Sequence, residues 1–163
     1  MNEIRWHGRG GQGAITASKI VATAAFDNGF TGAVMIPTFG TERRGAPIFS
    51  SLKIAREKIY DLSPIETPDI VVVLDHLLLK EVDVAKGLKQ NGLIVLNTPK
   101  PVTAYDFGGA RVAVADVSAL SVEAGLPRAP DQERLRLAVE SGEPRSVRTL
   151  HRGLIAWRSA RWA

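Results

Sequence analysis

The sequence of 163 residues contains no cysteine, and its three histidines, His7, His76 and His151, lie far apart. Without cysteine the chain forms no disulfide, no thiolate zinc site and no iron–sulfur cluster of its own. The spacing of the histidines matches no pattern of metal ligands. We therefore expect this chain to hold no metal.

Long apolar runs are also missing, since no stretch reaches the roughly 18 apolar residues that a membrane-spanning helix needs. The first residues include Glu3 and Arg5 instead of a basic stretch followed by an apolar block, so no signal peptide is predicted. A hydrophobic content of 45% is typical of a globular domain. We expect a cytoplasmic protein that does not contact a membrane.

Lysine is absent from the last 36 residues, which hold eight arginines and four acidic residues. Residues 1–127 hold seven lysines, six arginines and 13 acidic residues, so their charges balance. The net charge of +4 therefore comes from the C-terminal segment. We divide the chain into a domain at 1–127 and an Arg-rich segment at 128–163, in which basic helices are predicted at 130–141 and 146–162.

Strand-like and helical patterns alternate along the first domain. The expected strands are 3–7, 32–36, 47–55, 69–75, 93–96 and 111–115, and the expected helices are 14–28, 76–90 and 117–124. The stretch 69–75 is apolar between charged ends, as in a strand buried on both faces, so we place it at the centre of the sheet. The alternation predicts an α/β fold with three α/β/α layers and a mostly parallel, Rossmann-like sheet, followed by a divergent basic helical C-terminal segment.

Glycines cluster between the first strand and the first helix, in a loop that we expect to bind the phosphates of an anionic cofactor. Its residues are Gly8, Arg9, Gly10, Gly11, Gln12 and Gly13. Glycines let a backbone approach a ligand closely, and the N-terminus of a helix attracts anions. Arg9 offers a charge-assisted hydrogen bond to a phosphate, and Gln12 donates or accepts one. The alternative is that the glycines only allow a tight turn and close helix packing.

The loop satisfies the G-x-G-x-x-G pattern of dinucleotide-binding proteins. That pattern also requires an acidic residue about 20 positions later, at the end of the second strand, to bind the ribose hydroxyls. Here the second strand ends at Met35, Ile36 and Pro37. The missing acid argues against a nicotinamide cofactor.

A second candidate segment, 38–47, connects two predicted strands and contains a pair of arginines. The residues that we single out in it are Phe39, Glu42, Arg43, Arg44 and Gly45. The arginines suit a phosphate or carboxylate, or ion pairs across a subunit interface. A solvated surface turn explains them equally well, because exposed arginine pairs are common.

Taken together, the glycine loop, the Ala-rich helix after it, the Glu-Arg-Arg-Gly segment and the Pro-Asp before the central strand resemble one family. They are similar to the gamma subunit of 2-oxoacid:acceptor oxidoreductases of the pyruvate:ferredoxin type, over about residues 1–127. The resemblance implies a complex that converts a 2-oxoacid and coenzyme A to an acyl-CoA and CO2. It also implies alpha, beta and delta-type partner subunits, which carry thiamine diphosphate, Mg2+ and the iron–sulfur clusters and pass electrons to ferredoxin or NAD(P).

Within such a complex, the resemblance assigns coenzyme A to the glycine loop and assigns the segment around Arg43 and Arg44 to a subunit interface or the border of the active site. It implies that the chain supplies no catalytic residue, in agreement with the missing cysteines. After Pro127 the sequence departs from the family pattern, either through a divergent ending or through a shifted reading frame.

The residues also suggest two other functions. A free-standing nucleotide-binding oxidoreductase of Rossmann type is disfavoured by the missing acid. A nucleic-acid or membrane arm formed by the Arg-rich segment is disfavoured because Glu residues are interleaved with the arginines. We therefore expect no nucleic-acid partner.

Overall fold

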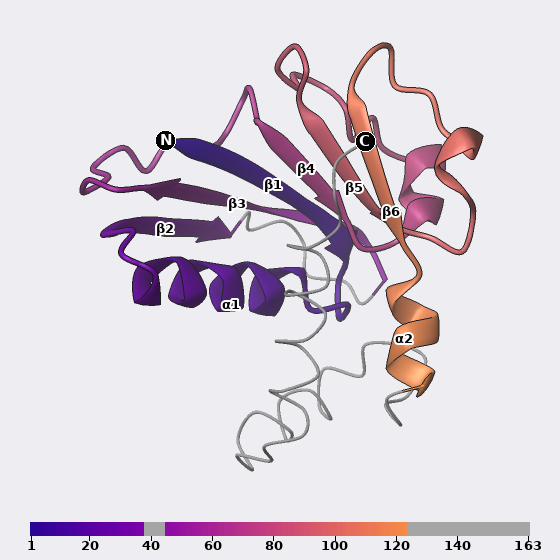
Figure 1. Ribbon diagram of the computed structural model, residues 1–163, viewed down its shortest axis with the longest axis horizontal. Helices are drawn as coiled ribbons and strands as arrows, with labels where there is room; N and C mark the ends of the chain where they lie inside the picture. The colour runs from indigo at the N-terminus through magenta and orange to yellow at the C-terminus, as the bar shows by residue number, and fades with distance from the viewer. Residues whose placement is uncertain (38–44, 124–163) are drawn as a thin grey trace.

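The computed structural model describes residues 1–37 and 45–123. They form one six-stranded sheet in the order β2-β3-β1-β4-β5-β6 (Figure 1). The strands are β1 (Asn2–Arg9), β2 (Gly32–Pro37), β3 (Pro47–Ala55), β4 (Ile70–Val73), β5 (Leu93–Asn97) and β6 (Arg111–Ala115). The strand segments predicted from the sequence are therefore confirmed, with small shifts at their ends.

The sheet is mixed but mostly parallel. β1, β4, β5 and β6 run parallel to one another, whereas β3 is antiparallel to both β1 and β2. β4 lies between β1 and β5, which confirms the central position predicted from its apolar run. The α/β class and the mostly parallel sheet are confirmed.

Helix α1 (Ala14–Asp27) covers one face of the sheet over β1, β2 and β3 (Figure 1). Its apolar side packs on a cluster formed by Ile4, Trp6, Leu52 and Ile54. The helix ends at Asp27 and is followed by its C-cap Asn28, whose backbone N–H donates to the carbonyls of Ala24 and Ala25. The predicted stop at Asn28-Gly29 is confirmed.

The opposite face carries a second core of six buried residues, Val71, Val73, Leu78, Val84, Ile94 and Leu96. Two of these, Leu78 and Val84, come from the segment after β4, which crosses this face. Because Val71 and Val73 alternate with Ile70 and Val72, which face α1, β4 is covered on both sides. The central layer therefore lies between two apolar clusters.

The helix predicted at 76–90 is wrong. Only a short 3-10 helix, η1 (His76–Lys80), forms there, and the following residues make turns. The guanidinium of Arg5 takes the carbonyls of Val84 and Lys86 as acceptors, while the carboxylate of Asp83 accepts from the N–H of Ala85. Helical hydrogen bonds are replaced by these contacts, which the apolar spacing of the segment does not reveal.

A further 3-10 helix, η2 (Val102–Ala104), precedes β6, and helix α2 (Val117–Glu123) follows it. The predicted helix at 117–124 is confirmed over its described residues, whereas the two predicted basic helices lie outside them. No helix in the described part of the chain combines the length and hydrophobicity that crossing a membrane requires.

Candidate functional site

The glycine loop lies where it was predicted: Gly8 and Arg9 form the end of β1, and the residues from Gly10 to Gly13 lead to the start of α1 at Ala14. Gly11 and Gly13 have φ angles of 94° and 80°, in the left-handed region that favours glycine. A Cβ atom at Gly8 would lie 3.2 Å from the Cβ atom of Ala14, so this glycine allows helix and strand to approach closely. Gly8 therefore serves helix packing, whereas Gly11 and Gly13 allow the turn of the loop backbone.

The second candidate segment meets this loop at Gly45. The N–H of Gly10 donates to the carbonyl of Ala46 at 2.9 Å, and the N–H of Gly45 donates to the carbonyl of Gly10 at 3.1 Å. These bonds continue the pairing of β1 with β3 beyond Arg9 and Pro47. Phe39, Glu42, Arg43 and Arg44 lie outside the described residues.

The N-terminus of α1 has no cap from a side chain. Gly13 occupies the N-cap position, the first turn contains no acidic residue, and the structure gives no acceptor among the described residues for the N–H groups of Ala14, Ile15 and Thr16. Such N–H groups carry the positive end of the helix dipole and bind anions well. A phosphate fits this position chemically.

Arg9 is held by two carboxylates instead of projecting freely from the loop. Its Nε atom donates to Asp75 at 2.9 Å, its Nη2 atom to Glu81 at 2.5 Å, and its Nη1 atom to Glu81 at 3.3 Å and to the carbonyl of Gly45 at 3.1 Å. Arg9 therefore joins the glycine loop to the segment after β4 and to the end of the arginine-containing segment.

The side chain of Gln12 folds back into the loop. Its Oε1 atom accepts from the N–H of Arg9 at 2.8 Å, and its Nε2 atom donates to Asp75 at 3.3 Å. Asp75 also accepts from the N–H of Leu77 at 2.9 Å, which starts η1. Gln12 and Asp75 thus fix the shape of the loop from within.

The three charged groups are all ionised near neutral pH. Burial raises the pKa of Asp75, but hydrogen bonds from Leu77, Arg9 and Gln12 outweigh it and leave that pKa below its ordinary value. The hydrogen bond from Arg9 lowers the pKa of Glu81, and the bonds to Glu81 and Asp75 raise that of Arg9. One positive and two negative charges give this cluster a net charge of −1.

This cluster lies at the point where two parallel strands send the chain to opposite faces of the sheet. β1 leads into α1 on one face, and the neighbouring β4 leads into η1 on the other. Ligands of open α/β sheets bind in the crevice that such a divergence opens at the carboxyl ends of the strands. The position supports the glycine loop as the candidate site.

Comparison with known proteins gives the family. The family model for pyruvate ferredoxin/flavodoxin oxidoreductase matches residues 3–146. The chain belongs to this family. Subunit PorC of pyruvate synthase from Methanothermobacter marburgensis is 44% identical over 123 residues, which make up 76% of this chain and 67% of that protein.

Other members of the family agree with this assignment. The common gamma subunit of the pyruvate/ketoisovalerate oxidoreductases of Pyrococcus abyssi is 43% identical over 132 residues, or 78% of this chain and 71% of that one. The crystal structure of subunit PORC of pyruvate oxidoreductase from Thermotoga maritima has a TM-score of 0.67 and 32% identity, over 80% of this chain and 70% of that chain. The predicted membership of the gamma-subunit family is confirmed.

One solved structure shares the fold at lower identity. It is 2-oxoglutarate:ferredoxin oxidoreductase from Magnetococcus marinus with 2-oxoglutarate, coenzyme A and succinyl-CoA bound, with a TM-score of 0.62 and 20% identity. The match covers 78% of this chain and 22% of that one. A gamma-type fold therefore also occurs as part of a much longer chain.

Asp75, the acidic residue beside the glycine loop, was not predicted from the sequence. The dinucleotide-binding pattern requires its acid at the end of the second strand, but β2 is separated from β1 by β3. Asp75 instead follows β4, the parallel neighbour of β1. Parallel strands end at the same edge of a sheet, so the position of Asp75 after a predicted central strand was the available signal. Its oxygens are already used by Leu77, Arg9 and Gln12.

No sequence signal pointed to Glu81, because it lies in the segment that was predicted to be a helix. Among the described residues, no three His, Asp or Glu side chains are grouped to hold a metal ion.

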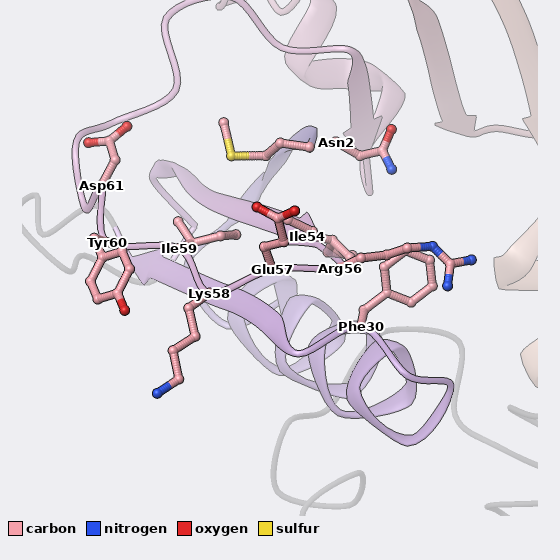
Figure 2. A pocket seen from close by; sticks show the side chains of 11 residues that line it. Asn2, Phe30, Ile54, Arg56, Glu57, Lys58, Ile59, Tyr60 and Asp61 are labelled. Carbon is pink, nitrogen blue, oxygen red and sulfur yellow. The ribbon is translucent and has the colours of Figure 1, made fainter.

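An open hollow of about 660 Å³ lies at the other end of β1, beside Asn2 (Figure 2). Its wall includes Phe30 and Arg56, whose guanidinium carbon lies 5.2 Å from the centre of the Phe30 ring. The glycine loop begins at Gly8, at the far end of the same eight-residue strand. This hollow is therefore separate from the candidate site.

Proposed function

We propose that this chain is the gamma subunit of a multi-subunit 2-oxoacid:acceptor oxidoreductase and that its glycine loop binds the phosphates of coenzyme A. The enzyme converts a 2-oxoacid and coenzyme A to an acyl-CoA and CO2, and electrons pass to ferredoxin or NAD(P) through other subunits. Thiamine diphosphate, Mg2+ and iron–sulfur clusters belong to the alpha, beta and delta-type partners. The family membership supports this role.

The observation that carries the ligand proposal is the uncapped N-terminus of α1 behind Gly11 and Gly13. Its N–H groups lie just beyond the carboxyl end of β1, where β1 and β4 lead to opposite faces of the sheet, and no side chain of the first turn competes for them. The phosphates of coenzyme A are strong anionic acceptors for such groups. The chain itself binds and orients the coenzyme, and it contributes no catalytic residue.

The kinetics of the assembled enzyme test this proposal. Gly11→Val places a branched side chain at a φ of 94° in the loop, and Arg9→Ala removes its charge. Each should raise the Michaelis constant for coenzyme A about tenfold, because Gly11→Val displaces the loop backbone and Arg9→Ala removes one charge-assisted contact to a phosphate. The Michaelis constant for the 2-oxoacid should stay unchanged.

Gly109→Val is the matched control, because Gly109 has a φ of 91° and lies in the connection before β6. It introduces the same backbone strain away from the loop. Unchanged coenzyme A kinetics in both Gly11→Val and Arg9→Ala would leave the glycine loop with a packing role only.

We further propose that Phe39, Glu42, Arg43, Arg44 and Gly45 form a subunit interface or the border of the active site. The support is that this segment ends at Gly45 against the glycine loop, where Arg9 donates to the Gly45 carbonyl. A partner that contacts the segment would therefore also approach the coenzyme site.

A further inference from the structure

The two carboxylates that hold Arg9 differ in how firmly each is fixed. Asp75 has a side chain that is 14% exposed and is bonded to Leu77 and Gln12 as well as to Arg9. Glu81 is 47% exposed, and its carboxylate has no contact besides Arg9 among the described residues. Asp75 therefore holds Arg9 in a fixed position, whereas Glu81 can release Arg9 to another anion.

Glu81 occupies the edge of the guanidinium that an anionic ligand would use. Its two oxygens accept from Nη1 and Nη2 of Arg9, in the fork geometry in which arginine binds carboxylates and phosphates alike. The Nε atom on the inner edge remains bonded to Asp75. The carboxylate of Glu81 therefore uses the same donors of Arg9 that a pair of phosphate oxygens would use.

We propose that Glu81 competes with the phosphates of coenzyme A for Arg9 and so sets the affinity of the glycine loop for the coenzyme. This inference rests on the proposed function of the loop. On binding, the phosphate takes the Nη atoms of Arg9 from Glu81, while Asp75 keeps Nε in place. Asp75 is a positioning residue, and Glu81 is an internal competitor.

The charges support the same direction of effect. Arg9, Asp75 and Glu81 together carry one positive and two negative charges, so an approaching phosphate meets a cluster with a net charge of −1. Removing the charge of Glu81 makes the cluster neutral and leaves at most one acceptor oxygen at this position, so the Nη atoms of Arg9 are held less firmly. Exposed ion pairs contribute little to stability, so this contact gives way to a phosphate of higher charge.

Two substitutions in the assembled enzyme should act in opposite directions. Glu81→Gln should lower the Michaelis constant for coenzyme A about threefold, the size expected for relieving one exposed ion pair. Asp75→Asn should raise it about tenfold, because Arg9 and Gln12 lose their fixed acceptor. A role of both carboxylates in stability alone predicts changes of the same sign.

Inorganic pyrophosphate provides a second measurement as a competitive inhibitor against coenzyme A. Glu81→Gln should bind it about threefold more tightly, and added salt should reduce that difference. The control is Glu3→Gln, which also removes one carboxylate charge from an ion pair, here with Lys89, but at the start of β1. It should leave both constants unchanged.

A constant for coenzyme A that rises or stays the same in Glu81→Gln would overturn the competition. If Arg9→Ala and Gly11→Val still raise the constant, the coenzyme site stands and only the role of Glu81 fails. If none of these variants changes it, the proposed function fails and the competition with it.

Discussion

Three basic side chains, Arg5, His7 and Lys53, are buried on the face of β1 and β3 that points away from α1. Arg5 donates to the carbonyls of Val84 and Lys86. Lys53 donates to Asp61 at 2.6 Å. His7 has no partner for its Nε2 atom among the described residues. Two of these residues are buried as charged and bonded groups, and the third avoids the cost of burial by remaining neutral.

Acid should therefore destabilise the fold through His7. Burial, followed by the nearby charge of Arg5, lowers the pKa of His7 from 6.5 to about 4. Above about pH 6.5 the ring is neutral in both states, and as the pH falls the unfolded chain takes up a proton that the folded chain refuses. The free energy of unfolding, measured by urea titration, should fall by roughly 2 kcal/mol from pH 6.5 to pH 5.

His7→Phe isolates this contribution, because the substituted ring stays apolar beside Phe49, whose ring centre lies 6.1 Å from that of His7. The variant should lose most of the pH dependence in that interval. If it keeps the full slope of the unmodified chain, other groups cause the acid sensitivity.

Some residues of the candidate site contact only their neighbours in sequence, whereas others contact residues far away in sequence. The glycine loop could be predicted because a strand, several glycines and a helix follow each other directly in the sequence. Asp75 and Glu81 act on it from 63 or more positions away, through pairing of β1 with β4. The inward turn of Arg9 and Gln12 depends on these distant acids and was not visible in the sequence.

Elements whose hydrogen bonds are made within the segment or with a neighbouring strand followed their sequence patterns. The segment 76–90 did not, because Arg5 of β1 donates to the carbonyls of Val84 and Lys86. A local apolar period cannot reveal an acceptor role toward a residue about 80 positions earlier. Tertiary contacts therefore override helical propensity at this element.

Gly87 in this segment provides a test of its irregular path. Its φ is 76°, and an added Cβ atom would lie 2.2 Å from the carbonyl oxygen of Glu66. Gly87→Ala should lower the free energy of unfolding by about 3 kcal/mol, through backbone strain and displacement of the 66–67 backbone. Chemical denaturation followed by circular dichroism measures this change.

The matched control is Gly108→Ala, because Gly108 also has a positive φ, 61°, but has open space where a Cβ atom would lie. It should cost about 1 kcal/mol, from the backbone strain alone. Equal losses in the two variants would contradict the close contact between Gly87 and Glu66.

At the scale of the whole molecule, the alternation of strands and helices predicted the α/β class and the central place of β4. The order β2-β3-β1-β4-β5-β6 was not predicted, because strand lengths and polarity do not say that β3 inserts between β2 and β1. That insertion brings Gly45 and Ala46 to the glycine loop and joins the two sequence motifs at one edge of the sheet. The juxtaposition suits a surface that a partner subunit covers.

Assembly of the complex tests that surface directly. With a tag on this chain, co-purified partners should bring the visible absorption of iron–sulfur clusters, since the chain has no cysteine to hold one. The double variant Arg43→Ala and Arg44→Ala should reduce partner recovery at least about tenfold, because arginines at interfaces carry much of the binding energy.

The control for that variant is Lys58→Ala with Lys100→Ala, which removes two exposed positive charges elsewhere on the described surface. It should keep full recovery, so that net charge alone is not the cause of any loss. If the arginine variant assembles normally but its Michaelis constant for coenzyme A rises, the segment borders the active site instead of an interface. Normal assembly with normal coenzyme A kinetics would make the arginine pair a solvated surface turn.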